Sequence, residues 1–333
     1  MNKADDLRLW RTFIMLADRG NLSEVADEVG VEISTVSRAV SQLEKSIGHQ
    51  LFKRNARPAV LTDRGRTLVP KVRQILELQD ALLDELRADS SDLRGEIRLS
   101  VSYGYAGTKL PFFLAKFNEL YPSVSFRVTP GLTVEDLKKG LCDIAVKTGE
   151  VADESVIRFY RGHNFYLPLA SPAYLETHPM PREPRDLAKH TVYLYSGPVR
   201  PPTEFFRKGN RIEPLEARNT IRMPSIQAVK NAVLAGLGVA ADLTLNKCAA
   251  EVLAGKLVPI IPGWYRPPMP VYTVISRSAW MLRRVRIFSE WFNQSNLEAD
   301  RRDVEKMRAF LRSRWGTKLP EIAEPRSAEA MPR

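Results

Sequence analysis

Two short helical segments joined by a tight turn are the feature that most constrains the fold of this 333-residue chain. Residues 23–30 predict a helix with Ser23 as its cap and Gly30 at its end, and a second helix capped by Ser34 follows at once. The second helix carries an apolar stripe at i, i+4 and i+7, formed by Val36, Val40 and Leu43. This arrangement predicts a helix-turn-helix whose second helix lies on a small core.

The outer face of this second helix is polar. Its side chains are hydrogen-bond donors and acceptors, namely Ser34, Thr35, Ser37, Arg38 and Gln42. The next segment, residues 52–62, contains two short extended runs and predicts a small hairpin wing with three bases, Lys53, Arg54 and Arg57. In helix-turn-helix proteins the start of the second helix meets base edges in the major groove, and nearby bases hold phosphates. We therefore expect these eight residues to contact DNA.

The charge balance supports a polyanionic partner. The chain has 50 Lys and Arg against 39 Asp and Glu, which gives a formal net charge of +11 and a pI near 9.7. The excess is local, because nine bases and two acids lie between Arg38 and Arg73. Double-stranded DNA is the partner that a basic helix-turn-helix implies. A generally basic surface without a partner is the alternative.

A long helix is predicted after the wing, with Thr62 as its N-cap. Its apolar residues lie three and four apart, and we expect five of them to form a dimerisation seam: Leu68, Val72, Ile75, Leu82 and Leu86. A long helix with such a seam usually pairs with a second copy, although packing on its own domain is the alternative. The sequence thus predicts a winged helix-turn-helix domain at 1–62 and a linker or dimerisation helix with a hinge at 63–94.

The chain alternates strands and helices after Gly95. Such alternation predicts parallel pairing with crossover connections. We expect two α/β lobes in residues 95–293, the first at about 95–167 and 267–293 and the second at about 168–266. The predicted fold class is therefore α+β multidomain, with a winged helix-turn-helix, a long linker helix and a two-lobed α/β domain.

A ligand cleft is expected between the lobes, where the carboxyl ends of strands meet. Short polar residues at strand ends or at a helix start, with two tyrosines that could cover an apolar group, mark it: Ser102, Tyr103, Gly104, Tyr105, Thr129, Thr148, Ser196 and Ser225. Hydroxyls donate without bringing charge and a helix N-terminus adds partial positive charge, so a polar or carboxylated metabolite is the expected ligand. Capping of helices and turns is the alternative role of each hydroxyl.

Other chemistries are not indicated. Cys142 and Cys248 stand in no metal-ligand spacing, so buried reduced thiols are expected. The four histidines are scattered, and the sequence predicts no catalytic site, no metal site and no cofactor. No apolar run approaches the roughly 18 residues of a membrane span, and the N-terminus lacks a signal-peptide core. A cytoplasmic protein without a membrane partner is expected.

An ordered set of motifs resembles the LysR-type transcriptional regulators from about Leu7 to Trp291. The N-terminal motifs are Ser37, Leu43-Glu44, Gly48, Leu51-Phe52, Arg54, Leu61-Thr62 and Gly65. Later stretches such as CDIAVKTG, LASPAYL and LAGKLVPII are similar to the family's effector-binding domain. The resemblance implies a periplasmic-binding-protein-like two-lobed domain without enzymatic activity, which holds a small-molecule effector at the positions named above. It also implies promoter binding as a homodimer or homotetramer, with RNA polymerase as a further candidate partner.

The chain departs from the family pattern in the recognition helix and in the C-terminal tail, besides a core variation at Val25-Ala26. Ile33-Ser34 stands where Gln-Pro often opens the recognition helix, so the operator sequence cannot be carried over from the family. Residues 294–333 extend beyond the family core, and their apolar positions predict one extra helix: Val304, Met307, Phe310 and Leu311. A solvated extension is the alternative.

Two other functions compete with this interpretation. A nicotinamide-dependent oxidoreductase would use residues 236–241 (GLGVAA), but here a helix is predicted before the motif and a strand after it, which reverses the dinucleotide-binding order. A two-lobed small-molecule binding protein would leave the basic N-terminal part without a role. A DNA shift at physiological salt, compared with a screen of nicotinamide cofactors, discriminates among them.

Overall fold

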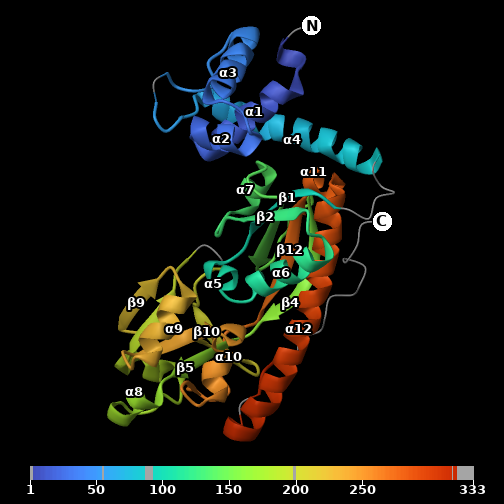
Figure 1. The fold of residues 1–333 in the computed structure, drawn as a ribbon. Coiled ribbons are helices and arrows are strands. Elements are labelled where there is room, and N and C mark those ends of the chain that lie inside the picture. Colours follow the sequence, from blue (N-terminus) through green and yellow to red (C-terminus); the bar gives the residue numbers. More distant parts are fainter. Residues whose placement is uncertain (1–2, 55, 87–92, 198–199, 317, 321–333) are drawn as a thin grey trace.

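The computed structural model describes residues 3–54, 56–86, 93–197, 200–316 and 318–320. Figure 1 shows a helical N-terminal domain followed by two lobes, each built around a five-stranded sheet. Among the helices in these ranges, none is both long and apolar enough to cross a membrane.

The N-terminal domain contains the predicted helix-turn-helix. After the short turn η1 (Lys3–Asp5), its helices are α1 (Leu7–Arg19), α2 (Leu22–Val29) and α3 (Ile33–Ile47). Gly30 ends α2 in the left-handed conformation, which glycine adopts without strain. The apolar stripe of α3 is buried in the core of the domain as predicted.

Two predicted helix caps are wrong. Asn21 rather than Ser23 caps α2, because its side chain accepts the Ser23 N–H at 2.9 Å. Helix α3 begins at Ile33, so Ser34 lies inside the first turn and its hydroxyl donates to Glu32 at 3.3 Å. A cap is the last residue with extended backbone, and sequence alone locates that residue only to within one or two positions.

The segment after α3 is held to the core by Glu44. Its carboxylate accepts the backbone N–H groups of Leu51 at 2.7 Å and of Phe52 at 3.0 Å. An antiparallel bridge joins Phe52 and Leu61 at the base of the wing, and the described wing residues form no longer strand pair. A Cβ at Gly65 would lie 2.3 Å from the carbonyl oxygen of Leu51, so only glycine fits there. These contacts explain several of the motif residues as packing requirements.

The linker helix α4 (Asp63–Leu86) begins where predicted, because the Thr62 hydroxyl accepts the Gly65 N–H at 3.0 Å. Its first half belongs to the N-terminal core, which it joins through Val69, Val72 and Leu76. It also contacts α11 (Arg277–Met281) of the first lobe. Residues 87–92 of the predicted hinge lie outside the described ranges.

Lobe I is a sheet in the order β2-β1-β3-β12-β4. Its strands are β1 (Gly95–Ser100), β2 (Val124–Val128), β3 (Ile144–Thr148), β4 (Val156–Asn164) and β12 (Met269–Ser276). Its other helices are α5 (Tyr103–Ala106), α6 (Leu110–Leu120) and α7 (Val134–Lys138). β1 pairs in parallel with β2 and β3, but β12 is antiparallel to β3 and β4. Purely parallel pairing was therefore the wrong expectation, because the chain returns from lobe II without a crossover helix.

Lobe II is a sheet in the order β11-β5-β10-β6-β9. Its strands are β5 (Tyr166–Ala170), β6 (Thr191–Tyr195), β9 (Asn219–Met223), β10 (Val239–Thr244) and β11 (Val258–Pro259). The remaining elements are α8 (Pro172–Thr177), η2 (Pro184–Lys189), the hairpin β7 (Phe205–Lys208) and β8 (Arg211–Pro214), α9 (Ile226–Leu234) and α10 (Leu245–Leu253). The chain first changes lobes at Phe165, between β4 and β5, and returns after β11.

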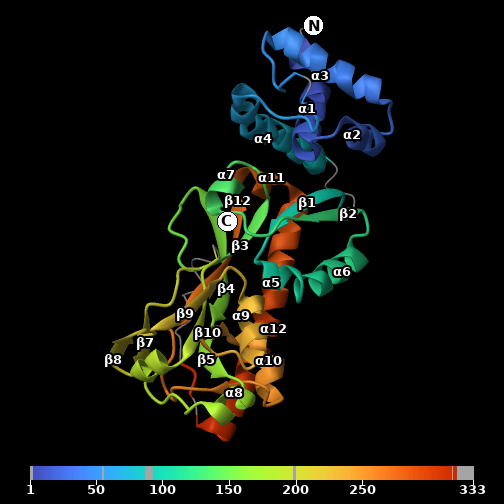
Figure 2. The same ribbon diagram turned by 90° about the vertical axis from the view of Figure 1, so that its left-hand side faces the viewer.

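One helix, α12 (Arg283–Trp315), runs along both lobes (Figure 2). Phe288 and Phe292 in its first half are buried in the core of lobe I, whereas Met307 and Leu311 in its second half are buried in the core of lobe II. The helix predicted for residues beyond 294 is thus present, but it continues α12 and does not form a separate element. Residues 321–333 of the extension lie outside the described ranges.

Candidate functional site

The polar start of α3 lies on the surface of the N-terminal domain. Ser34, Thr35, Ser37 and Arg38 are exposed, and Gln42 is half-buried. The other side of α3 carries the buried stripe of Val36, Val40 and Leu43. Because that side packs on the core, the polar face points toward solvent.

A basic hollow of about 800 Å³ lies between α3 and the wing. It is lined by four of the residues expected to contact DNA, namely Ser37, Lys53, Arg54 and Arg57. Sequence reasoning missed Ser41 and Lys45, which line the same hollow at four and eight residues after Ser37 and therefore on the same helical face. Four bases line the hollow against one acid, Glu44, so the hollow carries a net positive charge.

The five predicted seam residues of α4 separate into two groups. Val72 is buried in the N-terminal core and Leu68 packs against that core. Ile75, Leu82 and Leu86 are 50%, 58% and 76% exposed. Leu78, which is 57% exposed, extends this second group. We call Ile75, Leu78, Leu82 and Leu86 the exposed row of α4.

A cleft with two adjoining compartments lies where the lobes meet, and both compartments include Ser102, Ile226 and Lys247. The first compartment contains four predicted residues: Ser102, Tyr103, Gly104 and Ser225. The second contains three: Ser102, Tyr105 and Thr148. The structure therefore brings six of the eight predicted positions together.

Thr129 and Ser196 line neither compartment. Thr129 follows the edge strand β2, which β1 separates from the rest of the sheet, and its side chain is exposed. Ser196 is also exposed, and the preceding residue, Tyr195, lines the first compartment in its place. A hydroxyl at a strand end lines a cleft only when the strand ends at the cleft and the side chain lies on the face of the sheet toward it.

The hydroxyls in the cleft are fixed by local hydrogen bonds. Ser102 caps α5 by accepting a backbone N–H at 3.3 Å, and Ser225 caps α9 in the same way at 3.4 Å. Thr148 accepts the side-chain amide of Asn164 at 3.2 Å. Each of these oxygens keeps its own O–H for donation. Capping and ligand binding are thus compatible roles here.

The cations of the cleft were missed by sequence reasoning. Four side chains from β4, lobe II and its helices line the compartments: Arg161, Arg200, Lys230 and Lys247. Glu251 neutralises Lys230 at 2.6 Å. Burial, together with the neighbouring charges of Lys109 and Arg161, lowers the pKa of Lys247 to about 8. The cleft is therefore cationic and not lined by neutral hydroxyls alone.

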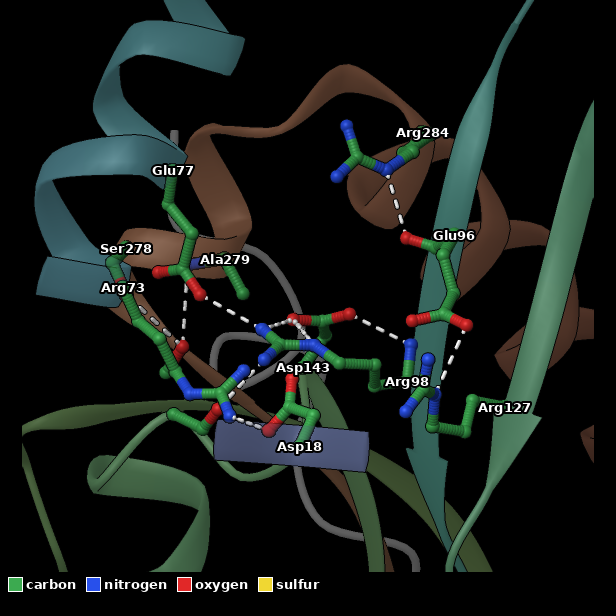
Figure 3. Close-up of polar contacts among 12 residues, drawn as sticks. Asp18, Arg73, Glu77, Glu96, Arg98, Arg127, Asp143, Ser278, Ala279 and Arg284 are labelled. Atoms are coloured by element: carbon green, nitrogen blue, oxygen red, sulfur yellow. Dashed lines mark hydrogen bonds and ion pairs between the residues drawn. The ribbon is translucent and has the colours of Figure 1, made fainter. Parts of the chain in front are cut away.

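A buried ion cluster connects α4 to lobe I (Figure 3). Arg98 of β1 donates to Glu77 of α4 at 2.8 Å and also pairs with Asp143, which precedes β3. One turn earlier on α4, Arg73 pairs with Asp18 of α1. Burial raises the pKa of Glu77, and the charge of Arg98 opposes that shift. The cluster fixes α4 against both the N-terminal domain and lobe I.

The cysteines, possible metal ligands and the GLGVAA segment can be located within the described residues. Cys142 and Cys248 are free and buried, as expected. Across the described residues, no group of His, Cys, Asp and Glu is placed to hold a metal ion. In the GLGVAA segment, α9 precedes the glycines and β10 follows them. Gly238 serves packing, since a Cβ there would lie 2.4 Å from the carbonyl oxygen of Thr191.

Comparison with known families assigns both halves of the chain. A family model described as bacterial regulatory helix-turn-helix protein, lysR family, matches residues 7–66. A second, described as LysR substrate binding domain, matches residues 90–296. The second match ends inside α12, so more than half of that helix lies beyond the family model.

Individual relatives agree with this assignment. The uncharacterized HTH-type transcriptional regulator YhjC of Escherichia coli K12 is 25% identical, over 86% of this chain and 96% of its own. The HTH-type transcriptional repressor PA14_22550 of Pseudomonas aeruginosa is 27% identical, over 86% and 91%. The LysR-type regulator CrgA of Neisseria meningitidis has a similar fold, with a TM-score of 0.57 at 22% identity over 87% of this chain and 98% of its own. The chain therefore belongs to the LysR family of transcriptional regulators, with a helix-turn-helix domain and a two-lobed effector-binding domain.

Proposed function

We propose that this LysR-type regulator binds promoter DNA sequence-specifically as a homodimer or homotetramer, and that a polar or carboxylated metabolite in the cleft changes that binding. The observation that carries the proposal is the exposed polar start of α3 beside a basic hollow. Promoter DNA as the partner places the protein in the cytoplasm.

The side chains around α3 divide into two roles. Thr35, Arg38 and Gln42 follow one another along the helix and reach toward base edges. Ser34 and Ser37 contact the backbone or base edges, and the wing bases Lys53, Arg54 and Arg57 contact phosphates. Base contacts select the sequence, whereas phosphate contacts hold the register.

The exposed row of α4 supports assembly. Four large apolar side chains spaced three and four apart lie on one face of a helix and remain largely exposed in the single chain. A second copy that presents the same row would cover them, as in a two-stranded helical pair. Leu68 and Val72 do not belong to this interface, since their own domain covers them.

The cleft and the DNA-binding domain are linked through one strand. β1 leads directly to Ser102 in the cleft, and its Arg98 binds Glu77 of α4. A ligand that moves the end of β1 therefore acts on the position of α4. This connection supports the proposal that a ligand bound in the cleft changes DNA binding.

Selection from a pool of random-sequence duplexes tests the proposed function. The full-length protein should enrich one motif with two related half-sites, because a symmetric dimer presents two copies of α3. Candidate metabolites are then added to the shift assay with the selected duplex. Failure to enrich any motif at physiological salt contradicts the proposal.

A further inference from the structure

The second compartment of the cleft contains a buried cation, Arg161, that no carboxylate of the described residues neutralises. Arg161 is 2% exposed, and among the described residues it makes no ion pair. Its Nη2 donates to the hydroxyl of Tyr105 at 2.6 Å and to Asn296 of α12. Its Nε and Nη1 are buried without a hydrogen-bond partner in the described part of the chain. A buried guanidinium with two open donors is costly unless an acceptor fills the space beside it.

Two more cations reach the same compartment from lobe II. Lys247 donates to the Thr108 hydroxyl at 3.1 Å and lies over the Tyr105 ring, but no carboxylate in the described ranges pairs with it. Arg200 shares the carboxylate of Asp242 with Arg266, so these three groups keep one positive charge. The Nε of Arg200 is also buried without a described partner.

The acid that lines this compartment is already engaged. Asp300 of α12 pairs with Lys109 at 3.2 Å, and Asp303 pairs with the same ammonium at 2.8 Å. Lys109 and these two carboxylates together carry one net negative charge, so about two positive charges remain around the compartment from three cationic groups, namely Arg161, Lys247 and the Arg200 group. They belong to different lobes, since Arg161 lies on β4 and the others lie in lobe II.

The geometry points to a small dianion as the effector, with its negative groups in the second compartment between Arg161 and Lys247. This inference rests on the proposed function of the cleft and narrows the ligand class. Like charges from opposite lobes repel each other across the compartment, and a bound dianion replaces that repulsion with attraction to both sides. The ligand would thereby favour approach of the lobes.

Malonate, acetate and malonamide are matched probes that carry two, one and no carboxylates. Calorimetry on the full-length protein, in buffer free of phosphate and sulfate, should show malonate binding about tenfold or more tightly than acetate. Malonamide should not bind. If acetate binds as tightly as malonate, or if malonate does not bind, the inference is wrong.

Arg161→Met provides the variant test. The Arg161 guanidinium lies over the Tyr105 and Phe292 rings, and the methionine side chain keeps an apolar group beside them. Tyr105 and Asn296 keep the hydrogen bond that joins them. Thermal stability without ligand should stay equal or rise, because an unneutralised buried charge is removed. Malonate affinity should fall about tenfold or more, whereas the exposed control Lys116→Met should leave it unchanged. Wild-type malonate affinity in Arg161→Met overturns the inference.

The pH dependence of malonate binding gives an independent check. Lys247 faces Lys109, Arg161, Lys230 and Asp300, and its pKa is lowered to about 8. Its protonated form binds an anion better, so malonate affinity should fall as pH rises through 8. Lys247→Met should remove this dependence, and a dependence that survives the substitution contradicts the assignment.

The DNA-selection experiment distinguishes failure of the proposed function from failure of this inference. If the protein binds malonate but selects no DNA motif, only the proposed function is wrong. If it selects a DNA motif but does not bind malonate, only this inference is wrong.

Discussion

At the scale of single residues, burial decides which side chains are available for chemistry. Arg38 is exposed and unshielded on α3, whereas Cys142 and Cys248 are enclosed within the lobes. Burial raises the pKa of each thiol to about 12, and the charge of Asp143 adds to the shift at Cys142. Both thiols are therefore protonated and inert at neutral pH.

The thiols should not react in the native protein. At pH 8 an aromatic disulfide reagent such as DTNB should release no coloured thiolate on the timescale of minutes, because neither sulfur is accessible or ionised. After unfolding in guanidinium chloride the same protein should release two equivalents. A fast equivalent from the native protein would show that one of these cysteines is exposed by local opening.

At the scale of elements, the helices α4 and α12 each connect two parts of the molecule. α4 divides its apolar residues between its own domain and the exposed row. α12 divides its residues between the two lobes, so one rigid element joins both cores. Each helix couples parts of the molecule that lie apart in sequence.

Charges in the exposed row of α4 should prevent assembly. The double variant Ile75→Glu with Leu82→Glu places unpaired carboxylates where two copies would exclude water, which is strongly unfavourable. Sedimentation equilibrium should show a monomer, and tight DNA binding should be lost because one half-site supplies only part of the contacts. The control Lys306→Glu changes the charge at an exposed position in the second half of α12, away from the row, and should leave assembly intact. A double variant that remains dimeric places the interface elsewhere.

The second half of α12 should stabilise lobe II. Met307→Ala or Leu311→Ala removes a fully buried side chain from that core, and each should lower the free energy of unfolding by about 2–5 kcal/mol. Urea unfolding followed by circular dichroism measures this loss. Lys306→Ala, on the exposed side of the same helix, should change stability by less than about 0.5 kcal/mol. Equal stabilities for all three variants would mean that the extension packs only loosely.

The sequence predicted elements better than it predicted the cleft. The stripe of α3, the Thr62 cap and the strand-helix order follow from local periodicity, and these predictions are confirmed. The observed N-caps of α2 and α3 lie two residues before the predicted ones, because the preceding turn determines where the extended backbone ends. The sequence could not predict that Arg161 and Lys247 line the same compartment, because only the tertiary structure brings these distant residues together. The β-branched and aromatic residues at the start of β4, Val156, Ile157, Phe159 and Tyr160, were a signal for that strand that sequence reasoning did not use.

At the scale of the whole molecule, three parts form one path from ligand to DNA. The cleft lies at the end of β1, β1 holds α4 through the Arg98 cluster, and α4 completes the core on which α3 lies. The family assignment accounts for the domain order, and the contacts in this chain account for how its parts are joined. Sequence-specific binding by α3 is the central claim, because the proposed regulation by an effector acts through it.

That claim is tested most directly by measuring how Arg38→Ala binds the selected duplex and a scrambled duplex of equal length. If Arg38 reads a base, the variant should lose about 1–3 kcal/mol on the selected duplex and little on the scrambled one. Arg57→Ala, a phosphate contact, should instead weaken both duplexes alike and reduce the salt dependence of binding. Wild-type affinity and wild-type preference in Arg38→Ala would contradict the account.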